Sequence, residues 1–123
     1  MEWMQLIYFY IGLAGALGAI SRYLVGIFFY SNSSFPFATL LVNLVGCYAL
    51  AYLSSRKFSF SSQLKTVIGT GFIGAFTTFS ALSVETIRLF EQGKVLLAFM
   101  YIIVSILGGI FMSNLGWKKE VVE

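Results

Sequence analysis

The sequence predicts an all-α integral membrane protein with four transmembrane helices, on the basis of three observations. Of its 123 residues, 59% are hydrophobic and only 11% are charged, whereas a soluble domain carries about 25% charged residues. The mean hydropathy is +0.87. The charged residues stand mostly at the ends of apolar runs, each close to the roughly 20 residues that span a bilayer. So much apolar surface must face lipid rather than water.

The first span is predicted at about residues 4–30. The segment from Trp3 to Ser21 carries no charge, and Arg22 then interrupts the run. The N-terminus has no basic segment, so we interpret this span as a retained helix and not as a signal peptide. A polar turn over residues 31–36 separates it from the next span. That turn ends in the only proline, Pro36, which the first turn of a helix tolerates.

The remaining spans are predicted at about 36–54, 64–88 and 94–117. A basic and polar loop follows the second span, and a short loop over residues 91–94 precedes the fourth. The chain contains no linker or repeat, so residues 1–123 are expected to form a single four-helix transmembrane domain. A chain this short has little interior of its own, so small-residue faces such as Gly12, Gly15 and Gly18 could also pack on a partner.

The composition argues against several classes of function. The chain has no histidine, and its one cysteine, Cys47, lies inside an apolar run. An intrachain disulfide is therefore impossible, and no metal-ligand spacing exists. No general base, nucleophile or acid pair suggests an enzyme. The net charge of +3 comes from basic residues scattered at span ends, which indicates interfacial anchors rather than nucleic-acid binding.

Two polar positions within the spans allow two interpretations each. An unpaired Arg22 in hydrocarbon would cost about 2.5–3.5 kcal/mol on insertion scales. It is either an anchor that snorkels to the interface or a cation in a water-filled vestibule that attracts anions. Asn43 and Thr39 stand four residues apart on one helix face. They are either interhelical hydrogen-bonding groups or donors that face a permeating ion.

The third span has an unusual centre. Residues 69–80 include Gly69, Gly71 and Gly74, followed by adjacent threonines and a serine. Glycine and threonine both weaken a helix. This segment is either a glycine-rich packing face or a helix broken in mid-membrane. A break would free backbone carbonyls, which lipid cannot satisfy and a bound cation could.

Three segments together resemble the signature blocks of one family. They are GALGAISRY at residues 15–23, TLLVNLVG at 39–46 and GFIGAFTTFS at 71–80. In order and spacing they are similar to the Fluc (CrcB) family of fluoride-specific ion channels, and the resemblance extends over the whole chain. It implies an antiparallel dimer with pores along the subunit interface. It also implies passive export of fluoride across the plasma membrane, which protects the cell from fluoride toxicity.

The resemblance also implies roles for individual residues. The backbone carbonyls of Gly74 and Thr77 would hold a structural, untransported sodium ion, and Arg22 would line the vestibule. Fluoride is small and strongly hydrated, so a pore must replace its water with side-chain donors and the positive edges of aromatic rings. The residues expected along the fluoride path are Thr39, Asn43, Phe79, Ser80, Tyr101 and Ser105.

The sequence departs from the family pattern at three positions. Ala81 and Leu82 stand where the family usually has threonine and a second phenylalanine, and Gly109 stands where serine or threonine is common. Each change removes a donor or a ring from the expected path. The dimer is therefore expected either with a second copy or with an opposite-facing paralogue that supplies the missing groups.

Charge placement predicts the orientation. With four spans, both termini share one side with the middle loop. That side carries five basic residues, against two on the other side, or three if Arg22 is counted. The positive-inside rule then places both termini in the cytoplasm. The five are Arg56, Lys57, Lys65, Lys118 and Lys119.

Two other functions compete with a channel. A small four-helix drug/proton antiporter would need an acidic residue within the first span, but the only acid there is Glu2 at its extreme end. An accessory subunit of a larger membrane complex would use its polar residues as packing groups, and that role would not account for three ordered blocks.

Overall fold

The computed structural model describes residues 2–30 and 32–119. Within these ranges the chain forms four helical segments long and apolar enough to cross a membrane, which confirms the predicted fold class. They are α1 (Glu2–Phe28), α2 (Phe37–Ser55), a composite third segment over Ser62–Glu91, and α6 (Val95–Gly116).

The third segment is bent, as the sequence predicted. It begins as α3 (Ser62–Thr66) and continues as a π-helix, η1 (Val67–Ile73). After the short α4 (Gly74–Phe76), the backbone is extended for two residues before α5 (Phe79–Glu91) begins. The π-helix was not predicted. Its wider turn coincides with the glycine-rich sequence, where local helix preference is weakest.

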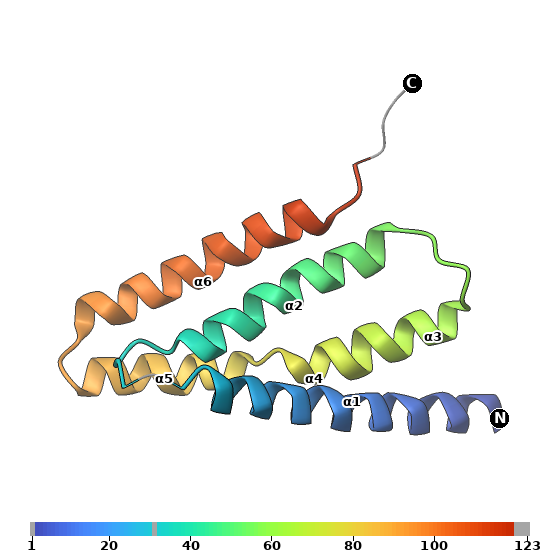
Figure 1. Ribbon diagram of the computed structural model, residues 1–123, viewed down its shortest axis with the longest axis horizontal. Helices are drawn as coiled ribbons and strands as arrows, with labels where there is room; N and C mark the ends of the chain where they lie inside the picture. The colour runs from blue at the N-terminus through green and yellow to red at the C-terminus, as the bar shows by residue number, and fades with distance from the viewer. Residues whose placement is uncertain (1, 31, 120–123) are drawn as a thin grey trace.

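The four segments run side by side along the long axis of the molecule (Figure 1). The two termini lie at one end, together with the loop between α2 and α3, and the other two loops lie at the opposite end. Helix α1 packs mainly on η1 and α4, whereas α6 packs on α2 and α5. The bent segment thus lies between α1 and the α2–α6 pair, where it is reached by polar side chains from both.

The ends of the helices are capped by local contacts. Pro36 is the N-cap of α2, and its carbonyl accepts a hydrogen bond from the Leu40 N–H at 3.2 Å. Ser31, at the start of the predicted turn, lies outside the described residues. Gly93 ends the third segment with a positive φ of 75°, which favours glycine, and lets Lys94 N–H close on the Leu89 carbonyl at 2.8 Å.

Few side chains of the described chain are buried within it. The apolar core comprises small groups such as Leu89, Ala98 and Tyr101. By contrast, large apolar side chains stay exposed along every span, among them Leu17, Ile27, Leu107 and Phe111. The subunit therefore presents apolar surface to lipid or to a partner.

Glycines set the closest approach between α1 and the bent segment. A Cβ on Gly18 would overlap the backbone carbonyl of Phe72. A Cβ on Gly71 would lie 2.8 Å from the Ile11 carbonyl oxygen and 2.9 Å from the Ala14 Cβ. The small face predicted on the first span thus serves this chain's own helix packing, at least at Gly18.

We expect Gly18→Ala to destabilise the protein by about 1–3 kcal/mol, the usual cost of overpacking. The new methyl group would push α1 away from η1, because the atom it meets is backbone and cannot swing aside. The measurement is thermal unfolding of the purified protein in detergent.

Gly12→Ala is the matched control, because nothing lies within 4 Å of a Cβ at that position of the same helix. Its melting temperature should equal or slightly exceed that of the wild type. Equal melting temperatures for the two variants would show that the close contact at Gly18 does not limit stability.

Candidate functional site

The site is centred on the break in the third segment. Thr77 (φ −85°, ψ 158°) and Thr78 (φ −152°, ψ 115°) have extended backbones between α4 and α5. The Asn43 side chain of α2 forms hydrogen bonds with both backbone groups of Thr78, its N–H and its carbonyl. The Thr78 N–H donates to Asn43 Oδ1 at 2.8 Å, and Asn43 Nδ2 donates to the Thr78 carbonyl at 3.1 Å. The Asn43 amide thus replaces the helical acceptor of the Thr78 N–H and adds a donor to the Thr78 carbonyl.

The backbone carbonyls of Gly74 and Thr77 are among those that lose their helical donors at this break. In a regular helix, the N–H groups of Thr78 and Ala81 would donate four residues back, to Gly74 and Thr77. Here the Thr78 N–H goes to Asn43, and the Ala81 N–H goes to the Thr78 hydroxyl at 3.1 Å. Gly74 is exposed and Thr77 is half-buried. These are the carbonyls that the sequence predicted to hold sodium, and their oxygens are the ligand type that hard cations take.

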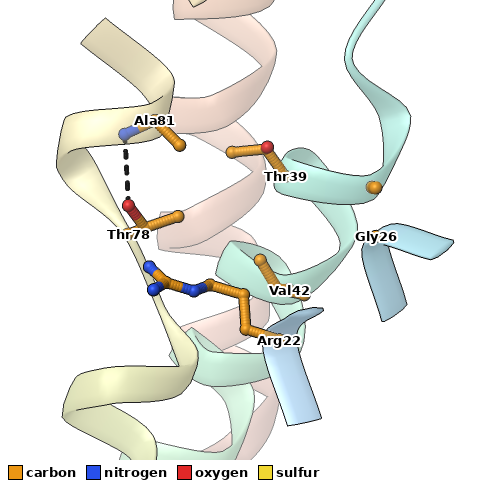
Figure 2. A pocket seen from close by; sticks show the side chains of 7 residues that line it. Arg22, Gly26, Thr39, Val42, Thr78 and Ala81 are labelled. Atoms are coloured by element: carbon orange, nitrogen blue, oxygen red, sulfur yellow. Dashed lines mark hydrogen bonds between the residues drawn. The ribbon is translucent and has the colours of Figure 1, made fainter. Parts of the chain in front are cut away.

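Arg22 reaches the break from the opposite helix. It lines a pocket with Thr39, Val42 and Thr78, and its guanidinium extends from α1 toward the segment that connects α4 to α5 (Figure 2). The pocket also contains Ala81, whose N–H is held by Thr78. Arg22 thus lines a pocket, as the interpretation of this residue as part of a vestibule requires. A fixed positive charge beside hydroxyl groups favours an anion there.

A carboxylate that the sequence analysis did not single out forms a second polar centre. Glu85 of α5 accepts hydrogen bonds from the Thr39 hydroxyl at 2.7 Å and from the Tyr101 hydroxyl at 2.9 Å. Tyr101 is fully buried. The signal that could have found this centre was an acidic residue beside apolar positions of a span, which is by default functional.

The other predicted path residues lie apart from this centre. The Phe79 ring, 80% exposed, projects away from the chain, and the exposed Ser80 contacts the Thr78 hydroxyl at 3.2 Å. The Ser105 hydroxyl is buried without a hydrogen-bond partner among the described residues. The chain therefore brings Thr39, Tyr101 and Asn43 to its interior. Phe79 stays on the outer surface of the subunit.

The three departures from the family pattern have different surroundings. Leu82 packs on the core group of Leu89, Ala98 and Tyr101, so it fills space inside the subunit. Ala81 lines the Arg22 pocket. Gly109 is buried, and a Cβ there would meet the Cys47 sulfur at 3.4 Å, so a larger residue would require that thiol to yield slightly.

The arrangement offers neutral donors, one cation and one carboxylate around a broken helix. Among the described residues, no three histidine, cysteine, aspartate or glutamate side chains are grouped so that they could hold a metal ion. Hydroxyl and amide groups near a cation suit the replacement of an anion's hydration shell.

Comparison with known proteins gives one consistent family. The family model described as CrcB-like protein, Camphor Resistance (CrcB), matches residues 9–117. A protein of Desulfitobacterium hafniense (strain Y51) named fluoride-specific ion channel FluC 1 is 56% identical over 109 residues, 85% of this chain and 96% of its own.

Other relatives carry similar names. FluC 1 of Bacillus cereus (strain ATCC 14579) is 50% identical over 134 residues, which cover 99% of this chain and 93% of that protein. FluC 2 of Listeria innocua is 49% identical over 112 residues, with 89% and 86% covered.

We expect Asn43→Ala to destabilise the folded protein strongly. It removes both bonds to Thr78 and leaves the buried Thr78 N–H unpaired, which costs about 1–3 kcal/mol. Thermal unfolding in detergent measures the loss.

The exposed Asn114 on α6 has no hydrogen bond in the structure, so Asn114→Ala is the matched control and should leave the melting temperature unchanged. If Asn43→Ala had the same melting temperature as the control, the Asn43 amide would not be what stabilises the break.

Proposed function

This chain belongs to the CrcB family, and we propose that it is a fluoride-specific channel subunit that lets fluoride leave the cytoplasm passively. One observation carries the proposal. Each of the three sequence blocks contributes a side chain to the same break: Arg22 from the first, Asn43 from the second and Thr78 from the third. Relatives named fluoride-specific ion channels support the same proposal. Passive conduction requires no catalytic group, so we do not propose an enzyme.

The site offers fluoride hydrogen-bond donors that other groups of the chain hold in place, and some of their hydrogens remain available. Asn43 spends its oxygen and one N–H on Thr78, and its second amide hydrogen remains for an anion. The hydroxyls of Thr39 and Tyr101 point at Glu85. To bind fluoride, each must turn from the carboxylate, so Glu85 competes with the ion. Such competition keeps binding weak enough for the ion to leave, which conduction requires.

The exposed ring of Phe79 supports a pore between subunits. The Phe79 ring is 80% exposed in the single chain, so a partner or lipid must cover it. In an antiparallel dimer the ring edge would line the fluoride path, and its positive rim would attract the anion without binding it tightly. The buried Ser105 hydroxyl, which lacks a partner in the described chain, would provide a further donor.

A structural sodium ion at the dimer centre would complete the break. The carbonyls of Gly74 and Thr77 lack their helical donors, and Gly74 is exposed. Carbonyls from two subunits would give the oxygen cage that a hard cation needs, and the ion would satisfy groups that lipid cannot.

The partner is either a second copy or an opposite-facing paralogue. The paralogue is supported by Leu82, which packs inward and offers no ring to the path. It is also supported by relatives whose names are numbered FluC 1 and FluC 2. The basic residues of the terminal side gather around one loop, which favours one orientation with both termini in the cytoplasm. Reporter fusions to the C-terminus would decide the orientation.

We expect the purified chain in liposomes, alone or with its paralogue, to conduct fluoride and exclude chloride. A fluoride electrode measures efflux when a potassium ionophore clamps the voltage. Phe79→Ile should abolish most of the flux, because it removes the ring edge. Asn43→Asp should do the same, because it replaces donors with a repelling charge.

Phe90→Ile is the matched control for the ring, since Phe90 is on the same helix but packs on Phe99. Equal passage of chloride would refute fluoride selectivity. A flux that appears only under a pH gradient would favour a proton-coupled exporter instead.

We expect a high-resolution density map of the dimer to show one ion between the Gly74 and Thr77 carbonyls. Thr77→Ser should keep it, because the ligands are backbone oxygens, and exchange of sodium for N-methylglucamine during purification should lower the melting temperature. A continuous helix through residues 74–79 with no ion density would contradict the sodium site.

A further inference from the structure

We infer that the terminal side of the subunit carries a binding site for one anionic phospholipid. The site has two parts, a basic rim for the phosphate and an apolar groove for an acyl chain. Neither part belongs to the break or to the Glu85 centre. The inference rests on the proposed function in one respect only, namely which face of α2 the second subunit covers.

The rim is the loop that follows α2. Residues 55–66 contain Arg56, Lys57 and Lys65 and no acidic residue. Lys118 is brought to the same place, because its N–H donates to the Ser55 hydroxyl at 2.8 Å. Clustered cations at the headgroup level attract anionic lipids, with about 1 kcal/mol contributed by each near the surface.

Hydrogen bonds fix this loop in place. The Arg56 guanidinium donates to the Gly116 carbonyl at 2.6 Å, at the C-terminal end of α6. The Lys65 ammonium donates to the Arg56 carbonyl at 3.1 Å. These contacts hold the charges together despite their mutual repulsion, and they leave the exposed Lys57 free to bind a phosphate.

An apolar groove opens directly beside the rim, between α2 and the first half of the third segment. Arg56 stacks on the Tyr52 ring, with its Cζ 3.8 Å from the ring centroid, and Tyr52 is part of the groove wall. An acyl chain would bury apolar surface in such a groove, whereas a free phosphate has no apolar surface to bury. The wall includes Tyr48, Tyr52, Leu53, Phe58, Phe60 and Ile68.

The groove lies on the side of α2 that faces away from the fluoride path. Tyr52 follows Asn43 by nine residues, which at about 100° per residue places the two on opposite sides of the helix. Asn43 faces the break. A second subunit that covers the Asn43 side of α2 would leave the groove to lipid.

Tryptophan quenching tests this site without reference to fluoride flux. Trp117 adjoins Gly116, which Arg56 contacts, and Trp3→Phe leaves it as the only tryptophan. In vesicles, phosphatidylglycerol with brominated chains should quench Trp117 more than brominated phosphatidylcholine does. Lys57→Gln should lower this preference about fivefold, the share expected of one surface cation.

Arg88→Gln is the matched control, because it removes an exposed positive charge at the opposite end of the molecule, and it should leave the preference intact. Equal quenching by both lipids overturns the site, as does an equal effect of the two substitutions. Relief of quenching by glycerol phosphate, beyond that of sodium chloride at matched ionic strength, would show a site for free phosphate instead. Cross-linking of two chains through Ala49→Cys in a Cys47→Ser background would show that a second copy fills the groove.

Discussion

The pairing of Asn43 with the Thr78 backbone is the interaction on which the rest of the structure depends. A helix cannot stop inside a bilayer unless its freed N–H and C=O groups find partners, because no water is available there. One amide satisfies both groups of Thr78, and the Thr78 hydroxyl then caps the helix that restarts. The chain can therefore be extended at residues 77–78 without leaving Thr78 unpaired. The carbonyls of the turn before the break, Gly74 and Thr77 among them, are left without helical donors.

The surroundings of the break follow from this constraint. Because α2 must deliver Asn43 to the bent segment, its neighbour one turn earlier, Thr39, reaches Glu85 beyond the break. Helix α6 supplies Tyr101 to the same carboxylate. On the other side, the glycine contact at Gly18 allows α1 to approach closely, and Arg22, one turn further along α1, then reaches the pocket. Polar groups from all four spans meet at the bent segment while the outside stays apolar.

The two ends of the molecule differ in charge and in the contacts that hold their loops. At the terminal end, a basic loop is tied to the end of α6 and bordered by an apolar groove. At the other end, Lys94 contacts the Ser34 hydroxyl, which ties the two loops there together. This asymmetry bears on orientation, because an antiparallel pair built from one such chain would place its basic loop on both sides of the membrane.

Length and hydropathy were enough to predict four spans, because both are local properties of the chain. Weak helical propensity left a break in the third span as one of two interpretations, and the family resemblance selected it. The quoted blocks were enough to predict the family, which is confirmed. The resemblance also implied that the Gly74 and Thr77 carbonyls hold sodium, and this stays a prediction. It could not decide whether Asn43 serves structure or conduction, nor reveal the π-helix or the partners of Glu85. Those depend on how α2, α5 and α6 are rotated and shifted against one another. Contacts between residues 35 and 46 positions apart set that geometry, and no local pattern encodes them.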